Sequence, residues 1–307
     1  MDNFADLLGT RYPVIMGAMG SISNPELVAA VSEGGGYGLL ATIGMDPDGL
    51  RRYISAVRKL TDKPFGVNLV ARNPLSPDLA GVLAQEGIGA VTTSAGSAET
   101  LASLLHAEGI KVIHVVPSPT LALKAWEAGV DGIVAEGGES GGMQSPHPIS
   151  TLSLVPQVVE AVPIPVAAAG GICDGHGYAA AFAMGAAGVQ IGTRLILTEE
   201  CDVHINYKEA LLRSSLIDTR VAATSIGHVR ALNNAFLRSL EALPREERAG
   251  KVTEMALRFP STCREEDMEH TLVVTGECAG AMEDILSACD VVNKIVEDGE
   301  YILQNLR

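Results

Sequence analysis

The sequence predicts a single (β/α)₈ barrel, because eight short apolar runs recur along its 307 residues with helix-like segments between them. The runs lack the polar–apolar alternation of half-exposed strands, which is typical of parallel strands buried on both faces. A chain of this length also suits one such barrel. The predicted strands are Pro13–Met16, Tyr37–Ala41, Phe65–Leu69, Ala90–Thr93, Lys111–Val116, Gly132–Ala135, Ile164–Ala168 and Gly188–Ile191.

Helix-like segments separate these runs, as in Ser97–Glu108 and Pro119–Ala128. No linker long or polar enough to separate a second domain interrupts the chain, so residues 1–307 are expected to form one domain. Residues 200–307 then form a helical appendage that covers the barrel. Within it we expect helices at Asn206–Arg213 and Asn233–Leu243, a charged break at Pro244–Lys251 and one or two closing helices within Asp284–Leu306.

Composition and charge restrict the class of function. Apolar residues make up 47% of the chain and aromatic residues only 4%, so we expect an aliphatic core. The formal net charge of −15 argues against nucleic acid, which is bound by a concentrated basic surface. It also makes docking to an acidic carrier protein less natural, unless a local basic patch compensates.

Cysteine usage and the chain start indicate a cytoplasmic protein. The five cysteines show no metal-ligand spacing such as C-x-x-C, so we expect reduced thiols and no metal site. No basic segment followed by an apolar run opens the chain, and no stretch of about 18 uncharged apolar residues occurs. We therefore expect no signal peptide and no membrane span, and a homodimer is left open.

Glycine-rich turns follow the last two predicted strands, where such barrels commonly hold a phosphate. Ala169, Gly170 and Gly171 follow the seventh run, and Gly192 and Thr193 follow the eighth. Bare glycine backbone lets phosphate oxygens reach N–H donors, and the Thr193 hydroxyl can add one more. Each pair of glycines alone could simply form a turn. Two such turns at these two strands favour a phosphate site built from neutral donors.

Amide side chains lie where a flavin ring would need them. Asn68 ends the third run and Gln190 lies within the eighth, and both can donate to and accept from the pyrimidine edge of the ring. Asn68 could instead be a buried turn residue. Met19, after the first run, could face the ring or pack in the core.

Ordered sequence blocks resemble the nitronate monooxygenase and enoyl-acyl-carrier-protein reductase II family. They span about three quarters of the chain and read YPVIMGAMG, TDKPFGVNL, VAEGGESGG, IPVAAAGGICDG, GVQIGTR and GHVRALNNAF. The resemblance implies FMN at the top of the barrel. The implied cofactor contacts are Gly17, Ala18, Met19, Asn68, Glu136, Gly141, Gly142, Gly170, Gly171, Gly192 and Thr193.

The chain departs from the family at the position of the acid or base. In both branches the segment matching Glu139–Gly142 is usually followed by a histidine, but here Met143 stands there and the next segment is about two residues longer. A thioether cannot transfer a proton. His147, four positions on, could replace the missing histidine or could be an exposed loop residue, and it is this loop's candidate catalytic residue.

Three other histidines are weaker candidates. His114 alternates with apolar neighbours in the fifth run, which is typical of a core histidine, and His176 lies in a DGHG turn, which is typical of the surface. His228 belongs to the last family-like block and could face the active site, with Arg230 and Asn233 positioning that block.

The resemblance implies one of two reactions. The favoured one is reduction of an activated alkene, an enoyl thioester or an enone, by NAD(P)H, and it needs a proton donor. The alternative is oxidation of alkyl nitronates with O₂, which needs no base because the nitronate is already an anion. A second alternative is an FMN-binding paralogue without catalytic activity.

Overall fold

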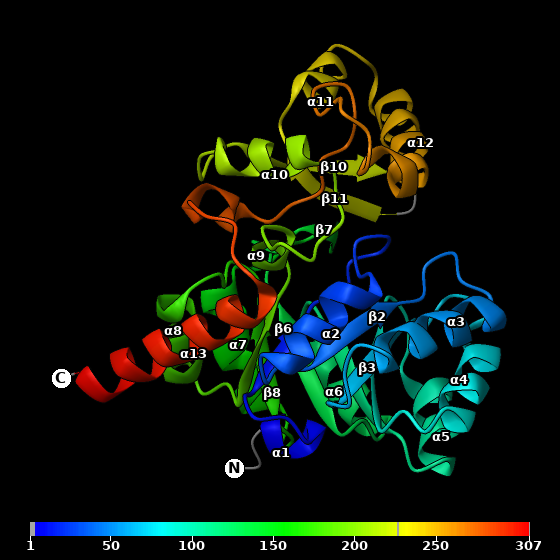
Figure 1. The fold of residues 1–307 in the computed structure, drawn as a ribbon. Helices are drawn as coiled ribbons and strands as arrows, with labels where there is room; N and C mark the ends of the chain where they lie inside the picture. The colour runs from blue at the N-terminus through cyan, green and yellow to red at the C-terminus, as the bar shows by residue number, and fades with distance from the viewer. Residues whose placement is uncertain (1–3, 226, 307) are drawn as a thin grey trace.

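A computed structural model, which describes residues 4–225 and 227–306, contains the predicted barrel (Figure 1). Its strands are β1 (Val14–Met16), β2 (Gly38–Ala41), β3 (Phe65–Val70), β4 (Ala90–Ser94), β5 (Lys111–Val116), β6 (Gly132–Glu136), β8 (Val166–Ala169) and β9 (Gly188–Ile191). They form one parallel sheet in the order β1-β9-β8-β6-β5-β4-β3-β2, and a parallel bridge between Ile15 and Tyr37 joins its two ends. Every predicted run overlaps one of these strands, which confirms the fold class.

Helices cover the outside of the barrel, and their starts are encoded locally. Asn24, Asp46, Ser118 and Asp174 each accept a hydrogen bond from the backbone N–H three residues further on. Three of these helices also begin with proline, whose missing N–H would have no partner there. The covering helices are α2 (Pro25–Glu33), α3 (Pro47–Arg58), α4 (Ser76–Gln85), α5 (Glu99–Ala107), α6 (Pro119–Glu127), α7 (Thr151–Ala161) and α8 (Gly175–Ala183).

Apolar side chains fill the barrel interior from its amino-terminal end. Phe4 of α1 (Phe4–Leu8) is fully buried there, and a Cβ on Gly132 or Gly188 would approach it to 3.1 or 3.0 Å. The Tyr37 hydroxyl crosses the interior and donates to the carbonyl of Ala90 at 2.8 Å. The same buried cluster contains Ile15, Leu39, Ile113, Val134, Ala167 and Ala169. The interior is therefore a packed core, and only the carboxyl-terminal mouth is left for a site.

A lobe lies beyond the carboxyl-terminal ends of the barrel strands (Figure 1). Its antiparallel sheet has the order β10-β11-β7, so the appendage is not helical throughout. The expected break at Pro244–Lys251 is wrong, because Arg245 begins an 18-residue helix. The lobe consists of α10 (Ile205–Leu212), β10 (Thr219–Thr224), β11 (Gly227–Leu232), α11 (Ala235–Ser239) and α12 (Arg245–Thr262), and β7 (Gly142–Gln144) joins it from the β6–α7 connection.

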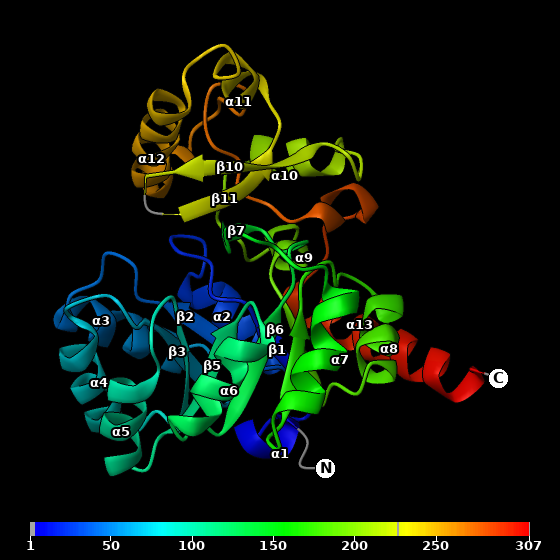
Figure 2. The same cartoon turned by 180° about the vertical axis from the view of Figure 1, so that it is seen from behind.

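The C-terminal helix α13 (Ala288–Asn305) returns to the barrel wall and packs beside α8 (Figure 2). A Cβ on Gly175 would lie 2.5 Å from Asp298, and one on Gly299 would lie 2.3 Å from the Tyr178 ring. This close packing confirms the expected closing helix. Among the described residues, no helix has both the length and the apolar character needed to cross a bilayer.

Candidate functional site

Three polar side chains point inward at the barrel mouth. Asn68, Glu136 and Gln190 lie at or near the carboxyl ends of β3, β6 and β9. Each follows by two positions a residue that faces the packed interior, namely Gly66, Val134 and Gly188. Because alternate residues of a strand share a face, the three side chains lie above the apolar filling, toward the barrel axis.

The amides of Asn68 and Gln190 differ in how they are held. Asn68 is buried, its Oδ1 accepts from Thr92 Oγ1 at 2.9 Å, and its Nδ2 donates to Ser94 Oγ at 3.3 Å. Oδ1 and Nδ2 can each make one further hydrogen bond in a fixed direction. Gln190 is half-buried, and its amide bonds to no other described residue.

Glu136 ends β6 and directly precedes the β6–β7 turn. Desolvation by burial raises the pKa of Glu136 to about 7, although a hydrogen bond with the Ser140 side chain acts in the opposite direction. A carboxyl group that titrates near neutrality can be present at the mouth either as a hydrogen-bond donor or as an anion.

The turns after β8 and β9 present backbone donors that the protein leaves free. Gly170 and Gly171 have φ values of +105° and +73°, which favour glycine. Within the described part of the chain, the N–H groups of Gly171 and Gly192 donate to no protein acceptor. A Cβ on Gly192 would meet only Met19 Sδ, at 3.7 Å. A Cβ on Gly171 would lie 3.3 Å from Glu139 Cβ. A free N–H donor beside open space, as at Gly192, suits an anion such as phosphate.

The turn after β1 lies directly beside the turn after β9. The N–H of Gly17 donates to the carbonyl of Ile191 at 2.7 Å, and a Cβ on Gly17 would lie 3.5 Å from Gly192 Cα. Ala18 and Met19 continue this turn and are half-buried. The structure therefore brings these predicted cofactor contacts together.

The hydroxyl of Thr193 contacts the C-terminal segment. Thr193 begins the short helix α9 (Thr193–Ile196), and its Oγ1 accepts the N–H of Gly276 at 2.9 Å. Gly276 directly precedes the 3-10 helix η1 (Glu277–Ala281). The hydroxyl oxygen thus anchors the segment after the lobe, and its contact with a phosphate stays a prediction.

The glycines after β6 pack against other parts of the protein. A Cβ on Gly141 would lie 2.6 Å from the backbone of Thr275 and Gly276. The neighbouring Glu139 carboxylate accepts from the backbone N–H and the hydroxyl of Thr151, at 2.9 and 2.7 Å, and so caps α7. The predicted FMN contacts of Gly141 and Gly142 stay predictions.

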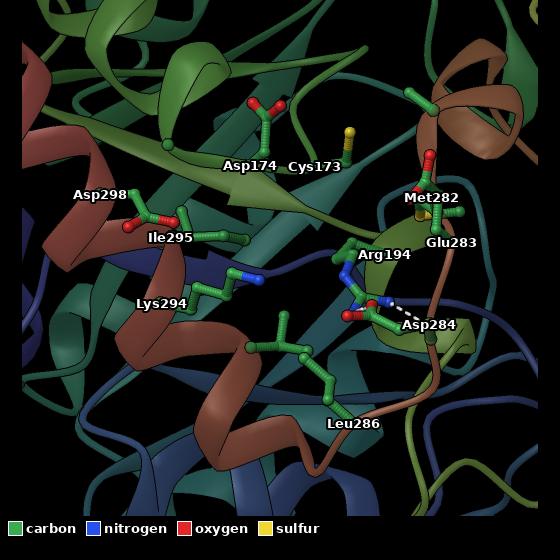
Figure 3. A pocket seen from close by; sticks show the side chains of 13 residues that line it. Cys173, Asp174, Arg194, Met282, Glu283, Asp284, Leu286, Lys294, Ile295 and Asp298 are labelled. Carbon is green, nitrogen blue, oxygen red and sulfur yellow. Dashed lines mark hydrogen bonds and ion pairs between the residues drawn. The ribbon is translucent and has the colours of Figure 1, made fainter.

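A cavity of about 190 Å³ lies between the β8 and β9 turns and α13 (Figure 3). In it, Arg194 donates to Asp284 at 2.6 Å, and desolvation by burial lowers the pKa of the guanidinium. Lys294 extends from α13 toward this pair (Figure 3). None of Asn68, Glu136 or Gln190 lines the cavity, which lies where the tail meets the barrel.

The structure separates the histidines by their surroundings. His147 is exposed in the loop before α7, and its backbone N–H donates to Ser145 Oγ at 3.3 Å. His114 is buried against Thr93 Oγ1 at 2.7 Å, and desolvation lowers its pKa, as expected for a core histidine. The His176 side chain is 86% exposed, as expected for a surface residue.

A polar sheet face of the lobe contacts the β6–β7 turn, and sequence reasoning missed its extent. Gln144 Nε2 donates to the carbonyl and hydroxyl of Ser140, at 2.7 and 2.6 Å. Arg230 Nη2 donates to the carbonyl of Gly138 at 2.7 Å, and Arg230 Nη1 lies 2.8 Å from the Glu277 carboxylate. The only sequence signal for this face is the alternation of polar and apolar residues in GHVRAL. That alternation can be interpreted only once the pairing of β11 with β7 is known.

The barrel and its mouth define the class, a (β/α)₈-barrel oxidoreductase of the flavin-dependent kind. The chain belongs to the nitronate monooxygenase family, whose sequence model matches residues 2–298. Relatives include "(3aS,4S,5R,7aS)-5-hydroxy-7a-methyl-1-oxo-octahydro-1H-indene-4-carboxyl-CoA dehydrogenase" of Rhodococcus jostii (strain RHA1), 39% identical over 237 residues, with 77% of this chain and 67% of the relative covered. A probable nitronate monooxygenase of Staphylococcus saprophyticus is 31% identical over 280 residues, with 76% and 79% covered.

Solved structures agree with this membership. FabK from Thermotoga maritima superposes with a TM-score of 0.92 at 38% identity, covering 100% of this chain and 99% of that one. The nitroalkane oxidase from Streptomyces ansochromogenes superposes with a TM-score of 0.86 at 28% identity, covering 99% of each chain. Both similarities extend over the barrel and the lobe.

Proposed function

We propose that the protein binds FMN at the barrel mouth. The free N–H groups of Gly171 and Gly192 carry the proposal, because neutral donors of this kind suit a terminal phosphate. Asn68, Glu136 and Gln190 then offer the ring amide and carboxyl partners near the barrel axis. The remaining proposed contacts are Gly17, Ala18, Met19, Gly141, Gly142, Ala169, Gly170 and Thr193.

The proposed reaction is reduction of an activated alkene by NADH or NADPH, with the bound flavin supplying the hydride chemistry. Similarity to FabK over the whole chain supports the reductase. The carboxyl-CoA dehydrogenases among the relatives support a thioester substrate. The net charge of −15 counts against an acidic carrier protein, so a CoA thioester, as in the relatives' names, or a free enone is the proposed substrate. The protein itself must bind the thioester, exclude water and provide a proton.

The proton donor predicted from the sequence is His147. Its exposure in the loop before α7 gives it access to solvent, and no described side chain holds the ring. The prediction is tested by His147→Ala, which should slow the substrate-dependent half reaction about 10²- to 10⁴-fold if His147 is the acid.

The second candidate function is oxidation of alkyl nitronates. The match to the family model and the similarity to the nitroalkane oxidase favour it. A preformed nitronate needs no base, so the absence of a histidine at position 143 would affect this reaction least.

Anaerobic stopped-flow mixing distinguishes the two reactions. Fast bleaching of the bound flavin by NADH or NADPH is expected for the reductase. Bleaching only by an alkyl nitronate would contradict the reductase and support the monooxygenase. We also propose a cytoplasmic location, with which the free thiols are consistent, and a single domain that can pair as a homodimer.

A further inference from the structure

One face of the lobe sheet points toward the barrel mouth, and His228 lies on it. Val229 and Ala231 belong to the apolar core of the lobe, so the residues that alternate with them face the other way. His228 and Arg230 occupy that other face, and the Arg230 guanidinium reaches the Gly138 carbonyl. His228 pairs in register with Gln144, whose amide reaches Ser140.

The residues that this sheet face contacts lie next to the proposed FMN site. Gly138 and Ser140 belong to the turn that begins with Glu136, one of the three polar residues at the mouth. Ser140 also bonds to the Glu136 carboxyl group. The row formed by Gln144, His228 and Arg230 therefore lies above the turn that leaves the mouth.

His228 carries a buried polar atom that the protein does not satisfy. Its Nδ1 is inaccessible to solvent and has no hydrogen-bond partner among the described residues. Buried ring nitrogens are normally paired, so an unpaired one on the sheet face that contacts the β6–β7 turn points to a partner that the protein does not supply. Its neighbours on the same face do have partners in the turn, since Gln144 Nε2 donates to Ser140 and Arg230 Nη2 donates to Gly138.

We propose that His228 donates the proton in the alkene reduction, an inference that rests on the proposed function. The N–H bond of the imidazolium breaks, and a C–H bond forms at the α-carbon with the electron pair left by hydride addition at the β-carbon. Neutral imidazole remains, and solvent returns its proton. A histidine suits this step because its ordinary pKa lies near neutrality.

The sheet register explains why position 143 does not supply the donor. Met143 pairs with Val229, so its side chain lies on the face opposite to Gln144, and it is 51% exposed. A histidine introduced at 143 would point away from the turn, whereas one at 144 would lie beside His228. Moving the imidazole between these two adjacent positions therefore tests the geometry directly.

The experiment uses the FMN-loaded protein, reduced by NADH and mixed anaerobically with crotonyl-CoA. His228→Gln should slow reoxidation about 10²- to 10⁴-fold and leave the reduction by NADH within about twofold. His270→Gln is the matched control, because His270 is also in the lobe and its side chain is 76% exposed. In the His228→Gln background, adding Gln144→His should raise the reoxidation rate at least about tenfold, whereas adding Met143→His should leave that rate unchanged.

A binding measurement tests His228 without turnover. Titration with 4-hydroxybenzaldehyde, whose phenolate resembles the anion being protonated, should show at least about tenfold weaker binding in His228→Gln. If NADH fails to reduce wild-type protein, the proposed function fails, while the titration still decides whether His228 faces the ligand. Unchanged reoxidation and unchanged phenolate affinity in His228→Gln, or a loss confined to His147→Ala, would overturn the inference.

Discussion

The glycines after β6 and those after β8 and β9 look alike in the sequence but have different neighbours. A Cβ on Gly137 would lie 2.0 Å from Thr151 Oγ1, and one on Gly138 would lie 2.7 Å from Pro148 Cβ. A Cβ on Gly192 would meet nothing closer than Met19 Sδ at 3.7 Å. The glycines after β6 allow other parts of the protein to pack closely against them, whereas Gly192 borders a space that the protein leaves open.

This difference separates glycines required for packing from a glycine that borders open space at the same end of the barrel. Gly141 is also in the packing group, because Thr275 and Gly276 approach it. Gly170 belongs partly to that group, since its Cβ would lie 2.7 Å from Thr151 Oγ1. A glycine at a strand end is therefore a candidate cofactor contact only where the structure also leaves space beside it.

The largest expected effect is the loss of FMN in Gly192→Asp. A carboxylate placed beside the phosphate adds like charge in a partly desolvated turn, so FMN affinity should fall at least about 10³-fold, roughly 4 kcal/mol. The measurement is fluorescence titration of the apoprotein with FMN, and circular dichroism checks that the barrel remains folded. Retention of full flavin occupancy would place the phosphate elsewhere.

Gly137→Ala should instead destabilise the fold. Its Cβ would overlap Thr151, whose backbone lies 2.7 Å away, so the turn or the start of α7 must shift. Forced overpacking of this kind costs about 3 kcal/mol in the free energy of unfolding. Urea denaturation of the apoprotein measures it, and wild-type stability would show that Gly137 is not a packing residue.

Glu136 directly precedes the glycines after β6, and its carboxyl group should make the free energy of unfolding depend on pH. Burial raises its pKa from 4.5 to about 7, so the neutral carboxyl is favoured in the folded state. Its contribution is complete below about pH 4.5 and is lost as the pH rises through 7. Because the side chain is only partly buried, we expect wild type to lose about 2 kcal/mol over this range relative to Glu136→Gln.

The pH effect is measured by urea denaturation of the apoproteins at pH 4.5, 5.5 and 7.5. A difference between wild type and Glu136→Gln that stays constant with pH would mean that the carboxyl has the same pKa in the folded and unfolded states. An increase in wild-type stability with pH would reverse the predicted sign and contradict a raised pKa for Glu136.

The smallest effect is expected for Gly192→Ala. The added methyl group meets only Met19 Sδ, at an ordinary contact distance of 3.7 Å, and the φ of −123° lies outside the left-handed region, so stability should change by less than about 0.5 kcal/mol. Calorimetry of the apoprotein checks this value. A loss of stability comparable to that expected for Gly137→Ala would remove the distinction between the two groups of glycines.

The barrel could be predicted from the sequence because its strands are buried on both faces. Runs such as Gly132–Ala135 and Ile164–Ala168 are apolar without alternation, and turns or helices bound them on both sides. The positions of Asn68 and Gln190 at the barrel mouth could be predicted for the same reason, since each lies at or near a recognisable strand end, and their contact with a flavin stays a prediction.

The lobe was harder to predict because tertiary pairing defines it. β7 has only three residues, and most of β10 is only partly buried, so neither gives a strong periodic signal. Pro244 and the charged residues after it suggested a break, but that proline is the N-cap of α12. The approach of Gly276 to Gly141 joins segments far apart in the sequence, and no local pattern shows it.

The central claim is that the free donors at Gly171 and Gly192 hold the phosphate of FMN. The direct measurement is the flavin content of the purified protein, by absorbance and by chromatography of the material released on denaturation. We predict a yellow protein that releases FMN in near-stoichiometric amount. A colourless protein that also fails to take up added FMN would contradict the claim.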